Sequence, residues 1–185
     1  VLTWGTGDML FLNDLFPKDW KSFFAGRDET YLKAPAPSIK VSYYGETANL
    51  DLVWMPLFTP DRYIDGERFA YFSPMAGQSV AAPKGKLDAD EPNDLPGDGE
   101  LALRLFGRAG SAEWAVYGYH GFWKQPMGVN AIGEPVFPDL DVLGASFRAP
   151  VAGGIANSEI AWYEGEDSSG DDPRVPNDQL RALVG

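Results

Sequence analysis

A pair of carboxylates near the N-terminus is the first arrangement that could do chemistry. Asp14 and Asp19 could serve as the acid and base of a glycoside hydrolase, in which two carboxyl groups flank the bond that breaks. The chain holds 27 acidic residues, however, so one such pair is weak support for catalysis. Ser168 and Ser169 lie in a polar stretch without a partner histidine, which argues against a Ser-His-Asp triad. We therefore expect that the protein is not an enzyme.

Metal and cofactor sites are also weakly indicated. The chain has no cysteine and a single histidine, His120, which argues against a zinc site. Residues 5–8 (Gly-Thr-Gly-Asp) lack the later glycine and the Lys-Ser/Thr of a phosphate-binding loop, so they predict a turn. Five carboxylates in residues 88–98 and five in 164–172 could bind calcium, but neither set has the EF-hand spacing. We interpret both as solvated loops and expect no cofactor and no metal.

Length and charge limit the possible classes of protein. A chain of 185 residues is enough for a single domain. Its 15 basic and 27 acidic residues give a net charge of -12, which would repel a phosphate backbone, so we expect no nucleic-acid partner. Cysteine usage does not distinguish reducing from oxidising compartments. The chain begins with Val1 and not with Met, and we expect it to be part of a longer protein.

The elements that must position any functional side chain are β-strands. Between 143 and 148, and again between 157 and 163, apolar and polar side chains alternate with a period of two, and a turn over 150–154 joins the runs. The same hairpin plan recurs at 39–44 with 49–55 and at 101–106 with 113–123. Two further strand ends are expected at 1–4 and 180–185, which makes about eight strand segments.

Long segments separate these hairpins. They cover residues 57–99, 124–138 and 165–178, and a first segment, 5–37, contains only a short helical turn that Asp19 could cap. Short turns at one rim, long loops at the other and aromatic residues near strand ends are typical of an up-and-down transmembrane β-barrel. The pattern therefore predicts an all-β, antiparallel up-and-down barrel, with residues 1–185 as one domain or part of one. A soluble β-sandwich also alternates faces and stays the alternative.

The two faces of the predicted strands differ in polarity. One face carries apolar side chains, namely Leu50, Leu52, Trp54, Leu101, Leu103, Leu105, Leu143 and Phe147. The other carries Lys40, Asp51, Arg104, Arg148 and Glu159. The facing of 113–123 is ambiguous, because Tyr117 and Tyr119 oppose Trp114, Val116 and His120. In a barrel the polar side chains would line a lumen, whereas in a sandwich they would cover the outer surface.

Several segments resemble one membrane-protein family. Residues 4–8 (Trp-Gly-Thr-Gly-Asp) and 13–19 (Asn-Asp-Leu-Phe-Pro-Lys-Asp) are similar to segments that follow an early strand in large porin-like outer-membrane proteins of Gram-negative bacteria, the group that includes alginate-export-like channels. Residues 143–148, 159–163 and 176–178 are similar to hairpin and loop sequences of the same group. Such proteins are far longer, so the resemblance implies that this chain covers only part of a barrel.

Pattern and resemblance together predict an outer-membrane channel for passive or substrate-selective passage of small solutes. Residues 5–37 would fold into the lumen and narrow it, because charged side chains at a constriction bias which solutes pass. The expected constriction residues are Asp8, Asp14, Lys18, Asp19 and Arg27 in the inward segment, and Lys40, Arg104, Arg108 and Arg148 on the wall. The expected partners are small solutes, outer-membrane lipid and lipopolysaccharide, and further barrel sequence or other subunits.

Two other functions stay open at this point. In a soluble sandwich, a carbohydrate could stack on an aromatic platform formed by Tyr63, Phe69, Tyr71 and Phe72. A barrel could also be a scaffold for partner proteins that conducts nothing. Membrane fractionation separates the sandwich from the two barrel functions, and conductance separates the two barrel functions from each other.

Overall fold

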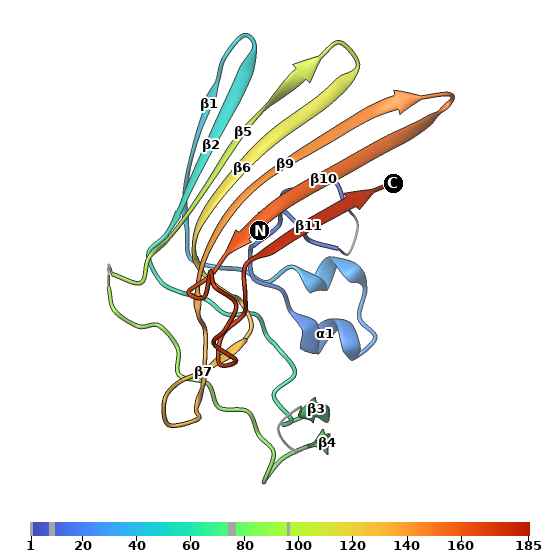
Figure 1. The fold of residues 1–185 in the computed structure, drawn as a ribbon. Helices are drawn as coiled ribbons and strands as arrows, with labels where there is room; N and C mark the ends of the chain where they lie inside the picture. Colours follow the sequence, from blue (N-terminus) through green and yellow to red (C-terminus); the bar gives the residue numbers. More distant parts are fainter. Residues whose placement is uncertain (1, 8–9, 74–76, 96) are drawn as a thin grey trace.

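One antiparallel sheet dominates the computed structural model, which describes residues 2–7, 10–73, 77–95 and 97–185 (Figure 1). Its seven strands follow one another in chain order, each hydrogen-bonded to its neighbours. They are β1 (Ile39–Tyr44), β2 (Ala48–Met55), β5 (Glu100–Ala109), β6 (Ala112–Phe122), β9 (Asp139–Val151), β10 (Gly154–Glu164) and β11 (Gln179–Val184). The prediction of an all-β fold with antiparallel hairpins is confirmed.

The connections at the two ends of the sheet differ in length (Figure 1). At one end, turns of two or three residues join β1 to β2, β5 to β6 and β9 to β10. The last of these turns places Ala152 and Gly153 at φ of 50° and 83°, a conformation that suits glycine. At the other end, long segments carry the two-stranded ribbons of β3 (Tyr71–Ser73) with β4 (Gln78–Val80) and of β7 (Gly128–Val129) with β8 (Pro135–Val136).

The N-terminal 37 residues contain no sheet strand among those described. The expected strand end at 1–4 is wrong for residues 2–4, and residue 1 lies outside the described residues. Residues 2–4 are irregular, because Gly5 turns the chain at a φ of 89° and the Trp4 and Phe16 rings pack in a T shape with their centroids 5.0 Å apart. The sheet therefore has seven strands instead of about eight. Short helical turns follow at α1 (Trp20–Phe24) and at a 3-10 helix over Glu29–Leu32. Asp19 caps α1 by accepting a hydrogen bond from the Ser22 amide at 2.9 Å, as predicted.

The strand register assigns every sheet residue to one of two faces. Across the sheet, Val41, Leu52, Leu103, Gly118, Leu143, Trp162 and Leu180 form one row. The next row on this face runs through Tyr43, Leu50, Leu105, Val116, Ala145, Ile160 and Ala182. We call this the outer face. It is apolar over all seven strands and largely exposed, with Leu143 65% and Ile160 47% accessible.

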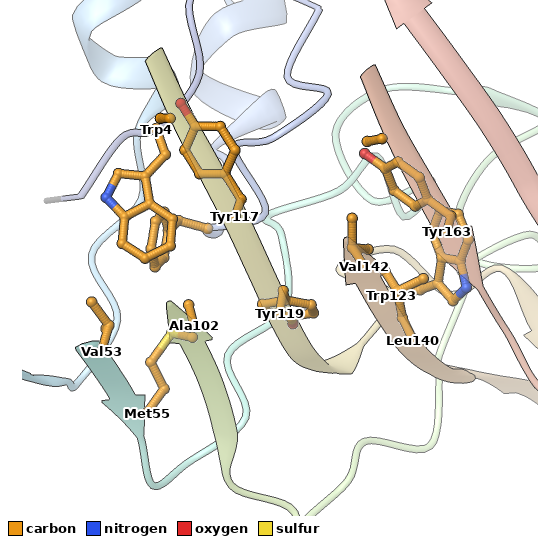
Figure 2. Close-up of a cluster of buried hydrophobic side chains, with 13 residues drawn as sticks. Trp4, Val53, Met55, Ala102, Tyr117, Tyr119, Trp123, Leu140, Val142 and Tyr163 are labelled. Carbon is orange, nitrogen blue, oxygen red and sulfur yellow. The ribbon is translucent and has the colours of Figure 1, made fainter. Parts of the chain in front are cut away.

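The opposite, inner face carries the buried core. Met55, Ala102, Tyr119, Val142 and Tyr163 project from it toward the N-terminal segment (Figure 2). The register resolves the ambiguous strand: Tyr117 and Tyr119 of β6 point inward and are buried, whereas Val116 and His120 are exposed on the outer face. Trp4 lies against Tyr117 with ring centroids 6.0 Å apart. The core therefore lies between one face of the sheet and the inward N-terminal segment.

The sheet is open in the described part of the chain. β1 and β11 form its two edges, and neither is paired with the other. The predicted closure into a barrel is thus not found among the described residues.

Candidate functional site

A buried carboxylate on the inner face binds the N-terminal segment. Glu159 of β10 is 3% exposed and accepts hydrogen bonds from the Thr6 amide, from the Gly7 amide at 2.5 Å and from the Thr6 hydroxyl at 3.0 Å. Its second oxygen accepts from Asn13 Nδ2 at 2.8 Å. Hydrogen bonds to an ionised acceptor are the stronger kind. The described part of the predicted turn, residues 5–7, therefore binds a carboxylate of the protein itself, and we call this set of contacts the Glu159 latch.

Two glycines permit the close approach that the latch requires. A Cβ on Gly7 would come within 2.5 Å of a Leu183 methyl group, so a side chain there would have to displace the Leu183 side chain of β11. A Cβ on Gly144 of β9 would overlap the Asn13 side-chain amide. A larger residue at either position would therefore displace a side chain at the contact between the inward segment and the sheet.

Asp14 and Lys18 form a buried ion pair in the same segment. Lys18 Nζ lies 3.1 Å from Asp14 Oδ1, and both side chains are at most 5% exposed. Lys18 also donates to the Phe16 carbonyl at 2.6 Å, and Asp14 accepts from the Thr3 hydroxyl at 2.9 Å. The two predicted constriction residues are therefore brought together, but each charge is neutralised by the other in an ion pair.

Asp61 ties the long segment after β2 to the inward segment. It accepts hydrogen bonds from the Lys18 amide at 2.7 Å, from Trp20 Nε1 at 2.8 Å and from Gln125 Nε2 at 3.3 Å. Burial raises the pKa of Asp61 above its usual value, because the low-dielectric surroundings disfavour the charged form more than these hydrogen bonds favour it. No sequence pattern indicated Asp61, which lies in a stretch without periodicity.

Asp19 contacts the same long segment from α1. Arg62 Nη1 lies 2.8 Å from Asp19 Oδ2. Burial alone would raise the pKa of Asp19, but hydrogen bonds from Ser22 and the Arg62 guanidinium outweigh it and lower the pKa below its usual value. The predicted residue therefore acts as a helix cap and an ion-pair partner.

A second buried ion pair lies at the loop end of the sheet. Glu100, which is fully buried, accepts from Lys124 Nζ at 2.5 and 2.6 Å and from the Tyr119 hydroxyl at 2.5 Å. Burial lowers the pKa of Lys124, since the neighbouring Glu100 only partly offsets the loss of hydration. Neither member of this pair was among the predicted site residues.

The predicted wall residues differ in whether they have an anionic partner. Lys40 Nζ lies 3.0 Å from Asp51 Oδ2, and Arg108 Nη2 lies 2.5 Å from Glu113 Oε1, so the charges of these two cations are neutralised. Arg104 has no carboxylate within 4.0 Å in the described residues, and its guanidinium stacks on Phe106 with 4.1 Å to the ring centroid. Arg148 on β9 is likewise without an ion pair among them and is exposed.

One further inward arginine was missed. Arg181 of β11 shares a row with Arg104, which runs through Asp51, Arg104, Tyr117, Gly144, Ala161 and Arg181. It has no carboxylate partner in the described part of the chain. The alternation of residues 180–185 would have placed it on the inner face, had those residues been treated as a full strand.

The remaining predicted residues do not join this set. Arg27 lies after α1 and is exposed, with its guanidinium 5.3 Å from the centroid of the Tyr31 ring. Asp8 lies outside the described residues. Among the described residues, no three metal-binding side chains gather closely enough to hold an ion. The inner face thus carries paired charges and three arginines, Arg104, Arg148 and Arg181, that have no carboxylate within 4.0 Å in the part of the chain that the structure describes.

Comparison with known proteins finds no relative of this chain. No family model matches the sequence, no curated protein matches it, and no solved structure matches its fold. No helix among the described residues is long and apolar enough to cross a membrane.

Proposed function

We propose that this chain forms part of an outer-membrane β-barrel channel of the porin-like kind, through which small solutes pass. The observation that carries the proposal is the apolar outer face of a sheet whose inner face holds charges. A water-soluble protein rarely exposes so large an apolar surface, whereas lipid would cover it. The aromatic residues Trp54 and Trp162 lie near the loop end of this face and Trp114 near the turn end, where a bilayer has its interfaces.

The length of the strands supports the same proposal. β5, β6, β9 and β10 have 10 to 13 residues, and a membrane-crossing strand needs roughly 9–11. On β9, the outward positions from Leu143 to Val151 are all apolar and cover about 27 Å along the strand at 3.4 Å per residue. With a tilt of about 40°, this corresponds to about 21 Å across the bilayer, close to the apolar band of roughly 25 Å in such barrels.

The inner face would then line the lumen. The Glu159 latch holds the inward segment against the wall, and Asp61 ties it to the long segment after β2, so the inward segment would narrow the pore as a fixed structure. Arg104, Arg148 and Arg181 would bias passage toward anions, because confined water screens their charges less than bulk water does. The proposed surroundings are the lipid and lipopolysaccharide of the cell outer membrane, with closure by further strands or other subunits.

The soluble carbohydrate-binding sandwich has less support. A sandwich needs a second sheet to cover the apolar face of the first. Besides the seven-stranded sheet, the described residues form only the ribbons β3–β4 and β7–β8, which have two strands each. Tyr63 and Phe72, two members of the expected aromatic platform, differ in environment: Tyr63 is partly buried near Phe137, and Phe72 is 63% exposed.

Two equally exposed apolar residues provide the test. Ile160 lies in the middle of the outer face, between the row of Trp162 and the row of Trp114, and is 47% exposed, and Met127 lies in a long loop and is also 47% exposed. In a membrane, Ile160→Arg is expected to destabilise the inserted protein by about 2–4 kcal/mol, whereas Met127→Arg stays in water and costs little. The readout is the fraction of the complete gene product that fractionates with the outer membrane and shifts its mobility on boiling. Equal behaviour of the two variants, in a protein found in the soluble fraction, would refute the channel.

A further inference from the structure

A cavity of about 790 Å³ lies beyond the loop end of the sheet, between α1, β3, β7 and β8 (Figure 1). Pockets that take small ligands have volumes of roughly 300–1,000 Å³ and are lined mainly by apolar and aromatic side chains. The aromatic side chains of this lining are Trp20, Phe24, Tyr63, Tyr71 and Phe72. The cavity therefore has the size and the lining of a small-molecule site.

Hydrogen bonds between separate segments hold the cavity wall. The Lys21 amide of α1 donates to the Arg62 carbonyl at 3.1 Å, and Lys21 Nζ lies 2.7 Å from Asp65 Oδ2. On another side, the Val129 amide of β7 donates to the Arg174 carbonyl at 2.9 Å. The wall is therefore held by contacts between segments that are far apart in the sequence, so the cavity is formed without a ligand.

The described lining contains one charged residue, Arg174, and its charge is neutralised. Arg174 Nε and Nη2 donate to Asp172 Oδ1 and Oδ2, at 2.9 and 2.6 Å. No carboxylate is among the lining residues that the structure describes. An anion would therefore find no free positive charge in this wall, and a cation would lose hydration without a counter-charge in direct contact.

The Tyr63 hydroxyl is neutral and lies in negatively charged surroundings. Burial and the nearby carboxylates of Glu91, Asp65 and Asp88 raise the pKa of Tyr63 to about 12, so the hydroxyl keeps its proton at pH 7. These three carboxylates do not line the cavity, but they would repel an anion at this end of it.

Several hydrogen-bonding groups of the lining are already bonded within the protein. Trp20 Nε1 and Gln125 Nε2 both donate to Asp61, at 2.8 and 3.3 Å. Three lining residues are prolines, which have no N–H to donate: Pro126, Pro135 and Pro173. A sugar would leave several of its hydroxyls without a partner here, whereas an apolar molecule needs no such partners.

We propose that this cavity binds a neutral small molecule with an aromatic, largely apolar body. Phe24 and Phe72 are 60% and 63% exposed, so a ligand that packs on them removes apolar surface from water. Aromatic rings also pair favourably with other rings in offset or edge-to-face arrangements. The described lining includes no residue of the seven-stranded sheet, so the inference does not rest on the proposed channel.

The test uses isothermal titration calorimetry of the full chain with the neutral probe 2-naphthalenemethanol. Two charged analogues keep the same ring system, namely 2-naphthoate and 2-naphthylmethylammonium, and cellobiose is the sugar. Phe24→Ala and Phe72→Ala each remove an exposed ring from the cavity wall. Phe147→Ala removes a ring that is 48% exposed on the outer face and is the matched control, because an apolar probe could also adsorb there. Circular dichroism checks that each variant keeps its strands.

The expected result is saturable binding of 2-naphthalenemethanol, with a Kd about tenfold or more below those of the charged analogues and of cellobiose. Phe24→Ala and Phe72→Ala should each raise this Kd about two- to tenfold, the effect of losing one ring contact, and Phe147→Ala should leave it unchanged. Absence of saturable binding, equal or tighter binding of a charged analogue or of cellobiose, or an effect of Phe147→Ala as large as that of the cavity variants would each overturn the proposal. If Phe24→Ala does not fold, Phe72→Ala decides it.

Discussion

Replacement of Glu159 by glutamine should loosen the N-terminal segment from the sheet. Oε1 of Glu159 accepts from the Thr6 amide, the Thr6 hydroxyl and the Gly7 amide, and Oε2 accepts from Asn13. Glutamine is of the same size and can keep an oxygen at the first position. It loses the negative charge and turns an NH2 group toward the Asn13 side chain.

The size of the effect follows from the number of bonds. A hydrogen bond to a charged group contributes about 1.5–3 kcal/mol and a neutral one about 0.5–1.5, so each of the three bonds to Oε1 weakens by about 1 kcal/mol. The NH2 group is tolerated if the Asn13 amide rotates, because Asn13 Oδ1 is buried and has no partner among the described residues. We therefore expect the latch to lose about 2–3 kcal/mol, a factor of about 30–150 in its opening equilibrium at 1.4 kcal/mol per tenfold.

Amide hydrogen exchange at Thr6 and Gly7 measures this opening directly, because both amides are bonded to Glu159 in the closed state. Their exchange should accelerate by about 30–150-fold in Glu159→Gln, the factor that corresponds to the expected free energy. Glu164→Gln is the control, since Glu164 ends the same strand on the outer face and is exposed. Exchange that accelerates no more than in the control would refute the assignment of Glu159 as the residue that holds the segment.

Three further perturbations test other parts of the inner face. Lys124→Met leaves the fully buried Glu100 without its cation and should cost about 3–5 kcal/mol in urea unfolding, and adding Glu100→Gln should recover most of it. The pKa of Asp19 is lowered in the folded state, so the ionised carboxylate stabilises the fold above pH 3.8, and this stability is lost as the pH falls through the lower folded-state pKa. The hydrogen exchange of the Ser22 amide should therefore accelerate in acid, and Asp19→Asn should remove that dependence on pH. Arg104→Glu with Arg148→Glu should lower the anion preference of the pore in planar bilayers, and an unchanged preference would exclude these arginines as its source.

Much of the sheet could be predicted from local alternation. Leu143 and Phe147 face outward with Leu52 and Leu103, as the period of two required. β6 could not be oriented because both of its faces carry large apolar or aromatic residues, and only pairing with β5 and β9 decides between them.

The candidate site depended on contacts that one sequence does not reveal. Asp14 and Lys18 are four residues apart and were both predicted, but the Glu159 latch joins residues 146 to 153 positions apart. Such contacts follow from where the segment crosses the sheet, which no local pattern encodes. Residues 2–4 were misassigned for the same reason: their alternation resembles a strand, but the chain turns at Gly5 and packs over Tyr117 instead of pairing.

The strand count has a consequence for how the two free edges can be joined. Each neighbour in the sheet is antiparallel to the last, so with seven strands β1 and β11 run in the same direction. Two copies of this chain sharing one barrel axis would have to meet through parallel pairs of edges. A closure that keeps every pair antiparallel needs an odd number of added strands, which gives the even total typical of bacterial single-chain barrels. Whether the number of added strands is odd or even, and not only how many there are, thus decides what can complete the sheet.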